Sequence, residues 1–168
     1  MAVYPSTTLG VFGASTLSVV PPLQYAGSWY SSTSQTVVGA NTETPLTFNS
    51  QSVNVGGFTY AGSTITVPVG GLYEITHSIQ FATTSGGTNQ AYFWAKKNGA
   101  TVAQTGSIVS IVNNGETLGT ISILDQASAG DQYAVSIQSA DANMTAKALV
   151  ASGNIPGIPA IITNVKRI

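Results

Sequence analysis

The stretch NVGGFTYAGSTITVPVGGLYEITHSIQF, from Asn54 to Phe81, divides into a first half rich in turn residues and a second half that alternates regularly. From Leu72 onward, polar and apolar residues fall on opposite faces of an extended chain. Glu74, Thr76, Ser78 and Gln80 share one face, and the other carries Tyr73, Ile75, His77, Ile79 and Phe81. This period of two predicts a β-strand with one buried face.

Similar segments recur from residue 25 to residue 168. Each is rich in β-branched and aromatic residues, and clusters such as SGG, NNGE and SAGD separate them. No segment combines a helical period with helix caps. The chain is therefore predicted to be all-β, an antiparallel sandwich, jelly roll or barrel. The predicted strands are 44–50, 63–69, 72–83, 89–99, 107–112, 117–126, 131–140, 144–151 and 160–168.

The composition describes a weakly charged chain. Charged residues make up 7% of the 168 residues and the net charge is −1, against a usual charged share of about 25%. Such a protein has little self-repulsion and suits a subunit of an assembly, whereas a nucleic-acid partner would favour a basic chain. Cysteine is absent, which excludes disulfides and thiolate chemistry. We expect a soluble chain without a signal peptide or a membrane span.

The N-terminal segment differs from the rest of the chain. Glu43 is the first charged residue, and Pro21-Pro22 favours extended backbone. We predict an extended arm over residues 1–24, lying on trimer mates or on another protein, followed by one domain over 25–168; a disordered leader is the alternative. The apolar residues expected to anchor the arm are Val3, Tyr4, Leu9, Val11, Phe12, Leu17, Val19 and Val20.

Three turn motifs carry a resemblance to a known family. They are a Pro-x-x-Gly-x-Tyr corner at 68–73, preceded by Asn54 and Phe58, a Lys-Asn-Gly turn at 97–99 and an Ala-Gly-Asp corner at 129–131. Over roughly residues 28–168 the chain resembles the tumour-necrosis-factor-like jelly roll, in particular the globular head of the first complement component. The resemblance implies a homotrimeric jelly roll with architectural corners at Pro68, Gly70, Gly71, Tyr73, Gly130 and Asp131.

The chain departs from the animal members of that family. We expect neither a collagen-like stalk nor a signal peptide, and the last residues are IPGIPAIITNVKRI. This ending is similar to jelly-roll domains in structural proteins of tailed bacteriophages and large DNA viruses, which implies a trimer that decorates a capsid or tips a fibre.

The residues that could carry chemistry are sparse. His77 has no nucleophile or carboxylate near it in the sequence, so we expect a histidine of the core or of a subunit interface. Asp131 is a weak calcium candidate, since Asp125 and Asp141 do not form a dense cluster with it. Neither a phosphate-binding loop nor a serine-hydrolase elbow occurs. We expect no metal, no cofactor and no enzymatic activity.

The segment AYFWAKK presents aromatic residues on both faces of its strand. Ala91, Phe93 and Ala95 are predicted to fill the core, while Tyr92 and Trp94 on the other face are candidates for the trimer interface. Carbohydrate stacking is the alternative for these rings.

These observations predict a viral, bacteriophage-type capsid decoration or cement protein on the capsid surface of the virion. Its expected partners are further copies of itself and the major capsid protein, with no nucleic acid and no membrane. Two alternatives stay open: the receptor-binding tip of a virion fibre that recognises a host glycan or protein, and a bacterial surface adhesin.

Overall fold

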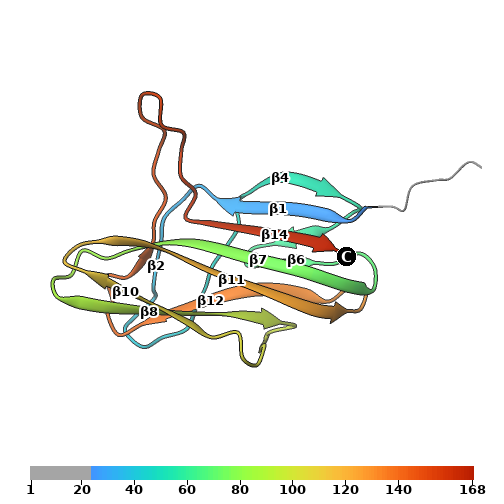
Figure 1. Cartoon of the computed structure of the whole chain (residues 1–168), viewed down its shortest axis with the longest axis horizontal. Helices are drawn as coiled ribbons and strands as arrows, with labels where there is room; N and C mark the ends of the chain where they lie inside the picture. The colour runs from blue at the N-terminus through green and yellow to red at the C-terminus, as the bar shows by residue number, and fades with distance from the viewer. Residues whose placement is uncertain (1–23) are drawn as a thin grey trace, which may run out of the picture.

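The structure is a computed structural model that describes residues 24–168. These residues form two antiparallel β-sheets packed against each other, without any helix (Figure 1). The predicted all-β antiparallel sandwich is confirmed. The described residues accordingly contain no helix that could cross a membrane. The eight apolar residues assigned to the arm lie outside the described part of the chain.

The first sheet is built around the long strand β7 (Gly71–Ala82). On one side β7 pairs along its whole length with β11 (Glu116–Ala127). On the other side it pairs with both β13 and β14. From this side the sheet continues through β14 (Ile161–Arg167), β1 (Ala26–Ser31) and β4 (Ser50–Val55), and through β13 (Thr145–Ala146) to β2 (Gln35–Thr36).

The second sheet is built around β8 and β12, which pair over seven residues of each strand. Its order is β10 (Ser107–Val112), β8 (Thr88–Lys97), β12 (Gln132–Ser139), β6 (Thr64–Thr66) and β5 (Thr59–Ala61). The short strands β3 (Thr44–Pro45) and β9 (Ala100–Thr101) pair with β12 and β8.

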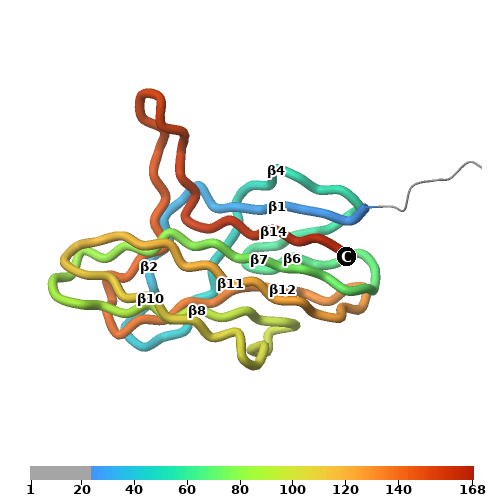
Figure 2. Tube along the Cα trace, in the orientation of Figure 1, coloured from blue at the N-terminus to red at the C-terminus, as the bar shows by residue number. Residues whose placement is uncertain are grey.

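Strands that are distant in the sequence lie side by side. The order β1-β14-β7-β11 in one sheet faces the order β6-β12-β8-β10 in the other, so the connections cross repeatedly between the sheets. Strand β1 pairs with β14, the last strand, and both termini of the described chain lie at the same end of the sandwich (Figure 2).

The core lies between the sheets. The predicted inward face of β7 is confirmed, because Tyr73, Ile75, His77, Ile79 and Phe81 are all buried. Phe81 stacks at a tilt on Phe93 of β8, with ring centroids 5.2 Å apart. Ala91, Phe93 and Ala95 are buried as predicted, and aromatic contacts of this kind add to the area buried.

Several predicted strand boundaries are wrong. Within 44–50 the strand residues are only Thr44–Pro45 and Ser50, where β4 begins. The Leu46 amide still donates to the Val135 carbonyl of β12, but Pro45 has no amide to donate. The sequence pattern does not delimit strand β1, because glycine and serine are weak strand formers. Gly27 is nevertheless required there, since a Cβ at this position would lie 2.0 Å from the Trp29 ring.

Candidate functional site

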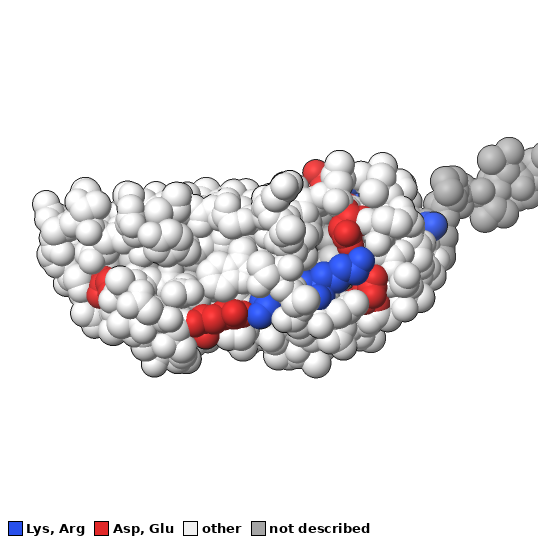
Figure 3. Space-filling model, turned by 90° about the horizontal axis from the view of Figure 1, so that it is seen from below, with Lys and Arg blue, Asp and Glu red and all other residues white. Residues whose placement is uncertain are grey.

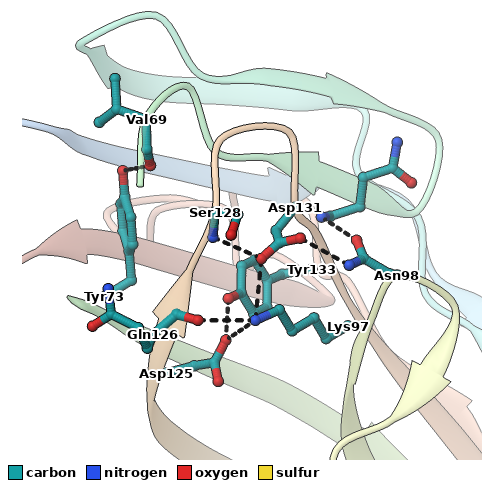
Figure 4. Close-up of polar contacts among 10 residues, drawn as sticks. Val69, Tyr73, Lys97, Asn98, Asp125, Gln126, Ser128, Asp131 and Tyr133 are labelled. Atoms are coloured by element: carbon teal, nitrogen blue, oxygen red, sulfur yellow. Dashed lines mark hydrogen bonds and ion pairs between the residues drawn. The ribbon is translucent and has the colours of Figure 1, made fainter. Parts of the chain in front are cut away.

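The three turn motifs of the sequence lie close together (Figure 4). The Asn98 side chain donates to Asp131 at 2.8 Å and accepts from the Gln132 amide at 2.8 Å. The Gly130 amide donates to the Val67 carbonyl at 2.9 Å. Asn98 and Gly99 both have positive φ, 52° and 79°, as a two-residue Asn-Gly hairpin requires. The motifs are therefore parts of one corner.

Lys97 lies at the centre of this corner. Its Nζ is 2.7 Å from Asp125 Oδ2, 3.1 Å from Asp131 Oδ2 and 3.1 Å from the Gln126 carbonyl. An ammonium group has three donors, so these three acceptors satisfy it completely. Tyr133, which is buried, donates its hydroxyl to the same oxygen of Asp125. The arrangement leaves Lys97 no free donor for a ligand.

The charges of this corner are stabilised by their neighbours. The pKa of Asp131 is lowered to about 2, first by the Asn98 side-chain amide, then by the Ser128 backbone amide, with Lys97 adding to the effect. The pKa of Lys97 is raised, first by its hydrogen bond to Asp125. Burial, followed by the bond to Asp125, raises the pKa of the Tyr133 hydroxyl. These shifts keep Asp131 ionised, Lys97 protonated and the Tyr133 hydroxyl neutral.

The corner at 68–73 packs beside this network. The Tyr73 hydroxyl donates to the Val69 carbonyl at 3.0 Å, which closes the turn that precedes β7. Gly71 has φ of 154°, and a Cβ there would lie 2.3 Å from Arg167 Nε. Pro68 lies within this turn, directly after the buried Val67. A Cβ at Gly70 would lie 3.3 Å from the Ala127 carbonyl oxygen.

His77 lies in the core and not at a surface. It is 1% exposed, and its Nδ1 is 2.7 Å from the Thr163 hydroxyl of β14. Its Nε2 is buried and has no hydrogen-bond partner among the described residues. Burial lowers the pKa of His77 to about 4, so the ring is neutral at neutral pH.

The calcium candidates do not converge. Asp125 and Asp131 share Lys97, whereas Asp141 accepts hydrogen bonds from Thr83 and Ser85 at another loop. Within residues 24–168 no three acidic, histidine or cysteine side chains are close enough together to hold a metal ion.

The charged side chains of the described region are mostly paired. Lys96 pairs with Glu43, Lys147 with Glu116, and Lys166 with Glu74. Arg167 lies over the Tyr25 ring, 5.4 Å from its centroid. Seen from below, most of the surface carries no charge, and blue and red atoms gather chiefly in one band (Figure 3).

An uncharged groove lies on the outer side of the second sheet. Its volume is about 610 Å³, and its walls are β8, β10 and the loop 101–106. Tyr92 is 43% and Ile108 50% exposed, and they face each other across the two strands. The indole nitrogen of Trp94, another lining residue, is buried without a partner in the described chain. The two trimer-interface candidates thus share one groove. No motif in the sequence indicates that the loop 101–106 completes it.

The sequence also missed a projecting hairpin at residues 148–159, here called the finger. It rises away from the sandwich (Figure 1). Its two arms are joined by hydrogen bonds between Leu149 and Ile158 and between Ser152 and Ile155. The predicted strand 144–151 is therefore wrong beyond Ala146. The turn signal Ser-Gly-Asn at 152–154, between apolar residues, could have indicated it.

Comparison with protein-family models and with curated proteins finds no match to this chain.

Proposed function

We propose that this chain is a structural subunit of a virus particle, a bacteriophage-type capsid decoration protein that acts as a homotrimer. In this proposal the role is mechanical and not catalytic. The trimer sits on the capsid surface, contacts the major capsid protein, and adds attachment energy between neighbouring capsid subunits.

The observation that carries the proposal is the outer surface. Each lysine among the described residues is paired with a carboxylate of the same chain, and the groove at Tyr92 and Trp94 has no charged lining residue. Such a surface offers little charge repulsion between copies. Exposed apolar groups beside uncharged polar ones are typical of protein–protein contacts.

The strand order supports the family resemblance on which the viral assignment rests. Two facing sheets ordered β1-β14-β7-β11 and β6-β12-β8-β10 have the crossing connections expected of a jelly roll. The motifs that suggested the resemblance also contact one another through Asn98 and Asp131. We therefore propose a jelly roll for the domain.

Light scattering tests the self-association. At micromolar concentration we expect about three times the 17.2 kDa monomer mass. A monomer that does not associate on concentration would remove the basis of the proposal.

Deletion of residues 1–22 tests the anchoring. The deletion ends before β1, which begins at Ala26, so we expect a folded trimer. The deleted segment carries eight apolar side chains, each worth about 1.5–3 kcal/mol when buried. We expect the truncated trimer not to co-sediment with capsids that lack the protein, whereas the full chain does. If the truncated protein binds capsids equally well, the arm is not the anchor; if both forms bind host cells but not capsids, a fibre tip replaces the present proposal.

A further inference from the structure

The finger interrupts a strand that is otherwise continuous. Ala146 pairs with Phe81, and Ile161 pairs with Ile79. Between them, Gln80 accepts a hydrogen bond from the Lys147 amide at 2.7 Å and donates one to the Ala160 carbonyl at 3.0 Å. The chain therefore leaves the sheet and returns to it at the same partner residue, as in a very large β-bulge.

The finger exposes apolar side chains and carries no charge. Val150 is 89% and Ile155 63% exposed, and residues 148–165 contain no charged residue. Four backbone hydrogen bonds join its arms, and within the described chain the amides of Val150, Ala151 and Gly157 have no partner. A two-stranded hairpin of this kind is marginal in water by itself, and exposed apolar groups together with free amides indicate a contact surface.

The groove at Tyr92 and Trp94 has the shape and the chemistry to cover the exposed side chains of the finger. It is concave, uncharged and lined by aromatic and aliphatic side chains, including Ile108 and Val102. Gln104 and Gln138 add side-chain amides to its lining, and amides of this kind can pair with free backbone groups. A volume of about 610 Å³ is within the usual range for pockets that bury most of the surface of a bound group.

The finger and the groove of one copy cannot meet. Figures 1 and 2 show the finger rising on the side of the molecule away from β8 and β10, which form the groove. A convex apolar element and an apolar groove at different places on one chain produce head-to-tail contacts between copies. Such contacts close into a ring when the rotation allows it, and closure makes the last contact intramolecular.

We propose that the finger of one copy inserts into the Tyr92–Trp94 groove of the next copy. This inference rests on the self-association in the proposed function and specifies its contact, but it is independent of the capsid. Val150 and Ile155 enter the groove beside Ile108, and the contact is heterologous, so each copy gives one finger and receives one.

The test uses variants that damage one side of the contact. Val150→Lys places a charge on the finger, and Ile108→Lys places one at the groove. Val38→Lys is the matched control, since Val38 is 73% exposed and lies in neither surface. Sedimentation velocity at micromolar concentration should give single copies for both contact variants, and wild-type mass for the control.

Mixing the two contact variants is the decisive measurement. The Val150→Lys chain keeps its groove and the Ile108→Lys chain keeps its finger, so we expect a 1:1 mixture to form a dimer that cannot extend. A contact of finger with finger, or of groove with groove, would be disrupted by only one of the two substitutions. A variant that lacks residues 148–160 joins Lys147 to Ile161 in register, and we expect it to fold as a single copy with a normal β-sheet circular-dichroism spectrum.

The outcomes separate the two proposals. A monomeric wild-type protein would contradict the self-association itself, and the finger contact with it. A wild-type trimer that persists in either contact variant or in the deletion, or a mixture that gives no dimer, would overturn the finger contact and leave the trimer in place.

Discussion

We expect His77 to make the stability of this fold depend on pH between neutral and mildly acidic conditions. The ring is buried in β7, only Nδ1 is hydrogen-bonded, and burial lowers the pKa from 6.5 to about 4. In the unfolded chain the pKa returns to about 6.5. Between these two values the unfolded state binds a proton that the folded state does not bind.

The sign and the size of the effect follow from this difference. The contribution of the neutral His77 ring to the free energy of unfolding is fully present above about pH 6.5 and decreases as the pH falls toward 4. Below pH 4 this residue causes no further decrease. At 1.36 kcal/mol for each pH unit, the total loss is about 3 kcal/mol. This is a large share of the roughly 5–15 kcal/mol that stabilises an ordinary domain.

The assay is urea unfolding, at one fixed protein concentration, from about pH 7.5 down to about pH 4.5. His77→Gln is the comparison, because glutamine offers the Thr163 hydroxyl a polar partner and does not titrate. Folding also lowers the pKa values of Asp131, Asp141 and Glu43, but their ordinary values of 3.8, 3.8 and 4.5 lie at or below the end of this range, so these groups contribute little within it. We expect a decline of about 3 kcal/mol in the wild type and a nearly flat profile in His77→Gln. Parallel profiles would refute the assignment of the decline to His77.

Two further predictions concern the corner before β7. Tyr73→Ala should cost about 3–5 kcal/mol, because the side chain is fully buried, whereas Tyr73→Phe should cost about 0.5–1.5 kcal/mol for the bond to the Val69 carbonyl; chemical denaturation measures both, and equal losses would contradict the role of the hydroxyl. Gly71→Val should lower the melting temperature far more than Gly70→Ala, because Gly71 has positive φ and its new side chain would displace Arg167; similar melting temperatures would show that the turn adapts.

The parts of the fold that were predicted correctly are those where local chemistry determines the structure. Strands β7 and β8 alternate because one face is buried, and a period of two shows this directly in the sequence. The Asn98-Gly99 hairpin follows from the tolerance of both residues for positive φ. Strand β1 is not evident in the sequence because its inward residues include Gly27. The need for glycine there becomes clear only in the structure, where the Trp29 ring occupies the space that a side chain would fill.

The candidate site was predictable only in part for a related reason. Tyr92 and Trp94 were assigned to the outer face by alternation, but the loop that completes their groove lies beyond the next turn of the chain. The network at Lys97 joins two segments about thirty residues apart in the sequence, 97–98 and 125–133, so no local pattern reveals that Asp125 and Asp131 share one ammonium group. Contacts of this kind depend on topology and not on local propensity.

The finger lowers the stability of the isolated domain. Residues 149–157 are all exposed, so they bury little apolar area, while ordering them and closing the hairpin both consume conformational entropy. The sheet itself does not need the finger, since Lys147 and Ile161 are already in register with β7. The finger therefore lowers the stability of the monomer while it exposes Val150 and Ile155. This arrangement is best explained if the assembly is stabilised when those two side chains are covered. In a ring of copies every finger would be covered by the next groove, and the cost to each domain would be offset at the contact.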